Sequence, residues 1–226
     1  MSENRITNAY ELGPASGGAP KQVVILLHGL GSNGQDLISL APYYAKAAPD
    51  AIFISPDAPF ACDMVPAGYP DSYQWFSLQS RDPEDMLAGV KNAAPIVMEF
   101  IDKALEKYGL GADKLALIGF SQGTMTSLYV APRYSDKIAG VLGYSGALIG
   151  EEGIVQDPDE FHKPPVRLIH GEADDVVDVA AYHHATEVLG NAGFDISGHT
   201  TPNLTHSIDE AGIESGSDFL KEIFSK

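Results

Sequence analysis

A serine between two glycines is the first feature of this sequence that suggests chemistry. Ser121 lies in the segment GFSQG at 119–123, directly after the apolar run 115–118 and directly before a helical pattern. A G-x-S-x-G segment in this setting is typical of a sharp strand-to-helix turn that exposes a nucleophilic serine. Glycines are needed on both sides because larger side chains would collide with the neighbouring strand and helix. Ser121 is therefore the predicted nucleophile, at the positive end of the following helix.

The acid that completes such a site is expected later in the chain, because the order after this kind of turn is serine, then acid, then histidine. The apolar run 166–169 leads into the segment HGEADD at 170–175. Its acidic residues would lie in a loop at the carboxyl end of a strand, where such folds collect their catalytic groups. Asp174 is the predicted acid.

Four histidines follow this loop and are candidates for the general base. His183 and His184 fall in a predicted helix, and His199 falls in a strand-like stretch. His206 lies in the loop 202–207, just before the last amphipathic helix. A base must come within hydrogen-bond reach of the serine, and a loop after the last strand suits this best. His206 is the predicted base.

A glycine-rich segment, HGLGSNG at 28–34, follows the first apolar run of the chain. Glycines there let backbone N–H groups approach a substrate oxygen closely, as an oxyanion hole requires. The order G-x-G-x-x-G and the acidic residue of a dinucleotide site are missing. The backbone N–H groups of Leu30 and Gln122 are the predicted oxyanion donors.

A metal site is a weaker interpretation of the same region. Residue types that ligate metals cluster at His170, Asp174, Asp175, His183 and His184, but no H-E-x-x-H spacing connects them. The sequence therefore predicts neither a metal nor another cofactor.

Alternating strands and helices must position these residues. Continuous aliphatic runs predict buried strands at 22–27, 51–54, 115–118, 138–142 and 166–169. Helical periodicity predicts helices at 83–108, with Pro95 inside, at 179–189, and at the C-terminus, where Ile208, Ala211, Phe219 and Ile223 could cover the sheet. Such alternation predicts an α/β fold with a mostly parallel sheet, helices on both faces and one domain over residues 1–226.

The long connection at 56–85 contains five prolines and cannot be one regular element. Its aromatic and aliphatic content is too high for a disordered segment. We expect an ordered flap that helps to line an apolar substrate site, with Met64, Val65, Trp75 and Phe76 as the predicted substrate-binding residues.

Composition limits the partners of the protein. Its 226 residues are 44% hydrophobic, which is enough for a packed core, and its formal net charge is -17. This charge opposes binding to nucleic acid or insertion at an anionic membrane. Cys62 is the only cysteine, and residues 1–10 show no signal peptide, so a cytoplasmic location is expected. A homodimer is compatible with the sequence.

Four motifs together resemble the phospholipase/carboxylesterase family, which includes acyl-protein thioesterases: LLHGLG at 26–31, ISPDAP at 54–59, GFSQG at 119–123, and the pair His206-Ser207. The resemblance spans nearly the whole chain. It implies an α/β-hydrolase without a cap domain or cofactor, acting on small acyl esters, thioesters or lysophospholipid-type esters. It also implies the triad Ser121, Asp174 and His206, with oxyanion donors at the backbone of Leu30 and Gln122.

One segment departs from the family pattern. The acid loop of the family usually reads Asp-Pro-x-Val-Pro, whereas here Asp174 is followed by Asp175, Val176, Val177 and Asp178. Loss of two prolines makes the loop more flexible, and either Asp174 or Asp175 could orient His206. The alternative function is a non-catalytic module that uses the same fold to bind an apolar ligand or a partner.

Overall fold

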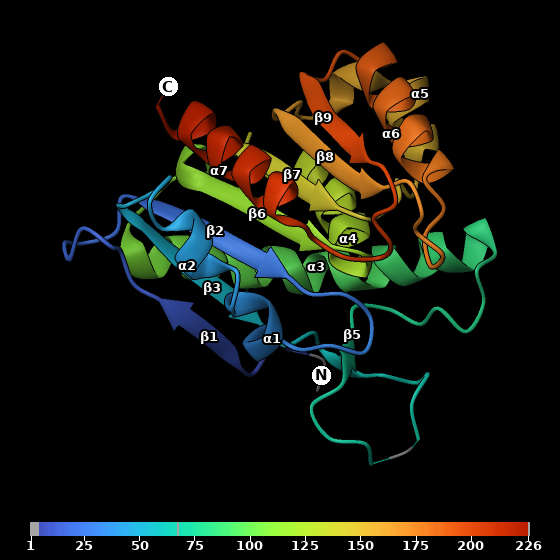
Figure 1. Cartoon of the computed structure of the whole chain (residues 1–226), viewed down its shortest axis with the longest axis horizontal. Coiled ribbons are helices and arrows are strands. Elements are labelled where there is room, and N and C mark those ends of the chain that lie inside the picture. The colour runs from blue at the N-terminus through green and yellow to red at the C-terminus, as the bar shows by residue number, and fades with distance from the viewer. Residues whose placement is uncertain (1–4, 67, 226) are drawn as a thin grey trace.

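A seven-stranded, mostly parallel sheet forms the centre of the computed structural model, which describes residues 5–66 and 68–225 (Figure 1). The strands lie in the order β1-β3-β2-β6-β7-β8-β9, and only β1 runs antiparallel to its neighbour. Their bounds are β1 Ala9–Leu12, β2 Gln22–Leu27, β3 Ala51–Pro56, β6 Leu115–Phe120, β7 Gly140–Tyr144, β8 Val166–Gly171 and β9 Ile196–Thr201. The predicted α/β class with a mostly parallel sheet is confirmed.

The predicted strands occur near their expected bounds, with one shift. The run 138–142 corresponds to β7 at Gly140–Tyr144, because Ile138 packs into the core before the strand ladder begins. Strand β1 was not predicted. It is a four-residue edge strand with no fully buried residue, so it lacks the apolar run that marks the central strands.

Helices cover both faces of the sheet because successive strand residues point to opposite sides. Val23, Ile25 and Leu27 pack beneath α3 (Pro83–Tyr108), α4 (Gln122–Val130) and α6 (Ala180–Asn191). Val24 and Leu26 pack against α1 (Gly34–Ile38), α2 (Ala41–Tyr44) and α7 (Glu210–Phe224). In Figure 1, α7 lies in front of the sheet and α3 behind it. The remaining elements are α5 (Glu151–Gln156), the strand pair β4 (Phe60–Ala61) and β5 (Tyr73–Gln74), and 3-10 turns at Ala112–Lys114, Ala131–Arg133 and Pro158–Glu160.

The predicted helix at 83–108 has the bounds of α3, with Pro95 inside it. The C-terminal helix differs in detail from its prediction. Phe219 and Ile223 are buried against the sheet, but Ala211 is exposed and Ile208 precedes the helix. Gly216 is instead the residue that lets α7 approach the sheet closely, since an added Cβ there would collide with the Tyr144 hydroxyl.

No helix in residues 5–66 and 68–225 has the length and apolar content needed to cross a bilayer.

Candidate active site

Ser121 occupies a strained turn between β6 and α4. Its backbone has φ 53° and ψ −116°, a conformation that costs a non-glycine residue free energy. The surrounding contacts hold it there: the Ser121 N–H donates to the Tyr144 carbonyl at 2.9 Å, and the Ser121 carbonyl accepts from the Met125 N–H. The side chain therefore lies at the first turn of α4.

The two glycines of the segment GFSQG permit this turn. A Cβ added at Gly123 would collide with the backbone carbonyl of Leu27, and one at Gly119 would collide with the backbone of Thr124. Both contacts are far inside 3.0 Å and involve backbone atoms, which cannot move aside. The two positions therefore require glycine for steric reasons.

His206 and Asp174 form a hydrogen-bonded pair. The His206 Nδ1 lies 2.8 Å from the Asp174 Oδ2, and the Asp174 side chain is fully buried. The other carboxylate oxygen, Oδ1, accepts the N–H groups of Val176 and Val177, each at 2.9 Å. Asp175, the alternative acid, is exposed. The geometry pairs His206 with Asp174.

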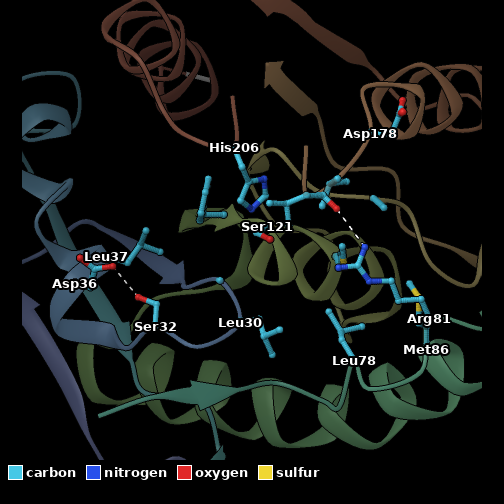
Figure 2. A pocket seen from close by; sticks show the side chains of 16 residues that line it. Leu30, Ser32, Asp36, Leu37, Leu78, Arg81, Met86, Ser121, Asp178 and His206 are labelled. Carbon is cyan, nitrogen blue, oxygen red and sulfur yellow. Dashed lines mark hydrogen bonds between the residues drawn. The ribbon is translucent and has the colours of Figure 1, made fainter. Parts of the chain in front are cut away.

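The charge state of Asp174 follows from these contacts. Burial alone would raise the pKa of this carboxyl group, but the hydrogen bonds from His206 and from two backbone amides outweigh it and hold the pKa below its usual range. An ionised Asp174 accepts the proton on His206 Nδ1, which leaves Nε2 as the basic nitrogen. Figure 2 shows the His206 imidazole beside the Ser121 side chain, at the same cavity.

The loop after β2 is held in place from several sides. Gly31 has φ +81°, and its N–H donates to the Tyr73 carbonyl at 2.8 Å. The Ser72 hydroxyl donates to the Gly31 carbonyl, and the Tyr73 N–H donates to the Ser32 carbonyl at 2.9 Å. The Leu30 N–H, in contrast, donates to no acceptor within residues 5–66 and 68–225. Leu30 thus offers an unpaired N–H next to residues 31 and 32, whose N–H groups are both paired.

His28 anchors the start of this loop from inside the protein. Its Nδ1 lies 2.7 Å from the Gly29 carbonyl, and its Nε2 accepts the Ala58 N–H at 3.0 Å. Only a neutral ring with the proton on Nδ1 satisfies both contacts. Burial lowers the pKa of His28, which agrees with this neutral form. The indole of Trp75 donates to the His28 carbonyl at 2.9 Å.

The side chain of Gln122 connects the nucleophile turn to the long flap. It is fully buried; its Oε1 accepts the Trp75 N–H at 3.0 Å, and its Nε2 donates to the Phe76 carbonyl at 2.7 Å. The Gln122 backbone is the first residue of α4, where N–H groups have no partner within the helix. Gln122 thus combines a free backbone donor with a structural side chain.

A cavity of about 420 Å³ opens over Ser121 and His206 (Figure 2). Most of its walls are apolar, formed by side chains from six separate loops and helices: Leu30, Leu37, Leu78, Met86, Met125 and Val176. Three charged side chains also line it: Asp36, Arg81 and Asp178. Ser121 and His206, the predicted nucleophile and base, therefore face an apolar chamber that is also lined by charged groups.

Four residues predicted to bind substrate lie outside this cavity: Met64, Val65, Trp75 and Phe76. Trp75 and Phe76 are buried, because their backbone and the Trp75 indole bond inward to Gln122 and His28. Met64 is 56% exposed and lies with Val65 in the β4–β5 connection.

The flap does contribute to the cavity, but through residues further along, Leu78 and Arg81. Sequence reasoning missed both, as well as Met86 and Met125. Met86 directly follows the flap, and Met125 follows the turn at Ser121, so their positions in the sequence were the signal that could have identified them.

The weak metal interpretation finds no support in the geometry. Within the described part of the chain, no three His, Cys, Asp or Glu side chains converge into a group that could hold a metal ion. His184 lies on α6 and pairs with Glu151 at 3.0 Å instead.

Comparisons with known proteins agree with this architecture. The family described as Phospholipase/Carboxylesterase matches residues 14–224. Esterase YpfH of Escherichia coli (strain K12) is 29% identical over 91% of this chain and 84% of its own length. Acyl-protein thioesterase 1 of Debaryomyces hansenii is 26% identical over 91% of this chain and 93% of its own.

Solved structures show the same similarity. The crystal structure of esterase PE8 superposes with a TM-score of 0.86 at 36% identity, covering 95% of this chain and 98% of that one. Zea mays acyl-protein thioesterase 2 superposes with a TM-score of 0.76 at 25% identity, covering 96% and 98%.

The fold and the site thus define an α/β-hydrolase of the serine-hydrolase class. The chain belongs to the phospholipase/carboxylesterase family, and it is a carboxylesterase or thioesterase.

Proposed function

We propose that this enzyme hydrolyses small acyl esters and thioesters through a triad of Ser121, His206 and Asp174. The observation that carries the proposal is the 2.8 Å contact between His206 Nδ1 and a buried, ionised Asp174, with the imidazole beside a serine on a strained turn. A histidine held in one tautomer by an acid is the arrangement that activates a serine hydroxyl.

The first half of the reaction forms an acyl-enzyme. The Ser121 Oγ attacks the acyl carbonyl as its proton passes to His206 Nε2, and Asp174 stabilises the resulting imidazolium. The backbone N–H groups of Leu30 and Gln122 donate to the developing oxyanion. The alcohol or thiol then leaves with the proton from His206.

The second half reverses these roles with water. His206 takes a proton from a water molecule, which attacks the acyl carbonyl on Ser121, and the carboxylic acid is released as the proton returns to the serine. No metal or other cofactor is needed, because the triad and two amides supply all the proton transfers and charge stabilisation.

The cavity supports an apolar acyl group of limited size. Its 420 Å³ lies at the lower end of the usual range of small-molecule sites, about 300–1,000 Å³. Leu30, Met86 and Met125 would contact the acyl chain, and methionine side chains adapt to different chain shapes. Short and medium acyl chains, esterified to an alcohol, a thiol or a lysophospholipid-type leaving group, are the proposed substrates.

A chain-length series tests the proposal. Hydrolysis of p-nitrophenyl esters of increasing acyl length should show an optimum for wild type and, for Ser121→Ala, a fall in kcat of about 10⁴- to 10⁶-fold. Ser39→Ala serves as the matched control, since Ser39 lies outside the cavity and should leave the rate unchanged. Equal rates for wild type and Ser121→Ala would contradict the triad.

A second experiment compares esters with thioesters as substrates. The same acyl group is presented as an oxygen ester and as a thioester, and the released thiol is measured directly. Because the acyl-enzyme is the same in both cases, deacylation should be equal and any difference in rate should reside in acylation. Turnover of only one of the two would restrict the proposed substrate class to it.

A further inference from the structure

We infer that a second histidine, His170, is a positioning residue that holds the acid Asp174 in its productive orientation. The inference rests on the proposed triad, because it assigns a role to a residue that acts only through Asp174. His170 does not line the cavity, and within residues 5–66 and 68–225 its side chain is bonded to neither Ser121 nor His206.

His170 is placed for this role at the carboxyl end of β8, four residues before Asp174. Its side chain is 2% exposed, and its Nε2 lies 2.7 Å from the Val177 carbonyl. A carbonyl oxygen can only accept, so this nitrogen carries the proton and donates it. The same Nε2 lies 3.3 Å from the Asp174 Oδ2. The N–H is therefore directed at the Val177 carbonyl, and the same nitrogen lies in close contact with the Asp174 carboxylate.

The carboxylate of Asp174 consequently lies between two imidazoles. Its Oδ2 faces His206 at 2.8 Å on one side and His170 at 3.3 Å on the other. Its Oδ1 accepts two backbone N–H groups of the same loop. Rotation of the carboxylate would break contacts on both oxygens, so the direction of the His206 ring is set by this whole group.

The bond from His170 adds to the contacts that order this loop, which include the Glu172 N–H to the Thr201 carbonyl and the Ala173 N–H to the Leu204 carbonyl, each at 2.9 Å. Asp175 and Val176 are exposed, and residues 172–179 contain no helix or strand. The bond from His170 to the Val177 carbonyl ties the far end of the loop back to β8 across seven residues. Without that bond, Val177 would lose its anchor to β8, and the Val176 and Val177 N–H groups that hold Asp174 Oδ1 would be less firmly placed.

Two amide replacements give a matched test. In His170→Gln the side-chain N–H reaches the position of Nε2, whereas in His170→Asn the shorter amide reaches only the position of Nδ1. The Gln variant should keep kcat within about threefold of wild type. The Asn variant should lose about 10- to 100-fold in kcat, the scale of a buried hydrogen-bonding group left without its partner.

The two kinetic parameters separate positioning from general damage. In His170→Asn, kcat should fall by a larger factor than KM rises, because His170 itself is not in the cavity wall and acts on it only through the loop that carries Val176 and Val177. His199→Asn is the control: it is half-buried on the neighbouring strand β9, outside the cavity, and should keep wild-type kcat. Thermal unfolding of each variant identifies any that do not fold.

A double-mutant cycle with Asp174→Asn tests whether His170 acts through the acid. If it does, His170→Asn should cost less than about threefold once Asp174 has been replaced. An equal loss in both backgrounds, or equal kcat for the Gln and Asn variants, would overturn the inference. If the Asn variant does not fold, the Gln variant decides alone: retained kcat supports the inference and a tenfold loss contradicts it.

Failure of the underlying triad would look different. In that case Asp174→Asn itself would leave kcat near wild type, whatever the replacements at His170 do. A large loss for Asp174→Asn with no distinction between the His170 variants would contradict only the present inference.

Discussion

Two loops face each other across the cavity, and they are stabilised in different ways. The loop 28–34 is held by several separate partners: the rings of His28 and Trp75, the backbone of Tyr73, and the Asp57 carboxylate, which accepts the Gly34 N–H at 2.7 Å. The acid loop 172–179 is partly exposed and converges on one charged group, the carboxylate of Asp174. The loop 28–34 therefore distributes its contacts over several partners, whereas the acid loop depends on the ionisation of one residue.

The largest expected effect separates the two aspartates of the acid loop. Asp174→Asn should lower kcat by about 10⁴-fold, because the amide favours the wrong tautomer of the partner histidine. Asp175→Asn should change kcat by less than about twofold, since Asp175 is exposed and the substitution removes only a surface charge. Steady-state kinetics on one ester measures both. The opposite ranking would assign the acid role to Asp175.

On the opposite side of the cavity the main effect should be on stability. Trp75→Phe removes the indole N–H and leaves the buried His28 carbonyl without that donor, which should cost about 1–3 kcal/mol of unfolding free energy. Urea denaturation of both proteins measures the difference. Tyr69→Phe, at a 63% exposed position of the same flap, is the control and should be neutral.

Acid pH should weaken the acid loop 172–179 in particular. The pKa of Asp174 is lowered in the folded protein, so its ionisation contributes stability that is present above the unfolded pKa and lost as pH falls through the folded value. The difference in Tm between wild type and Asp174→Asn should therefore shrink as pH falls below about 4. A constant difference between neutral and acid pH would show that the carboxylate charge adds nothing.

Arg81 should give the smallest effect. Its Nη1 donates to the Val176 carbonyl at 3.3 Å, a long bond between the flap and the acid loop (Figure 2). Arg81→Met keeps most of the apolar stem and should change kcat/KM for short esters by less than about fivefold. A larger change, measured across the chain-length series, would mean that the two loops are coupled through this residue.

Local patterns account for the parts of this molecule that were predicted well. The strand runs, the helix at 83–108 and the glycines around Ser121 all express short-range sterics and periodicity, which neighbouring residues determine. The order of serine, acid and histidine also limited the candidates for the site. The edge strand β1 was missed because its pairing with β3 leaves no apolar signature.

The cavity wall could not be predicted in the same way. Apolar residues of the flap could equally face the substrate or the core, since both environments favour the same residue types. The structure places Trp75 and Phe76 in the core, through bonds to His28 and Gln122, and leaves Leu78 and Arg81 at the cavity. That choice depends on partners more than forty residues away.

By itself, therefore, the sequence determined the fold class, the predicted nucleophile and the family, because each of these follows from contiguous motifs. Only the tertiary structure decided which aspartate faces His206, that His170 contacts the same carboxylate, and which side chains surround the substrate space. These are contacts between separate loops, and their geometry exists only after the sheet has brought the carboxyl ends of its strands together.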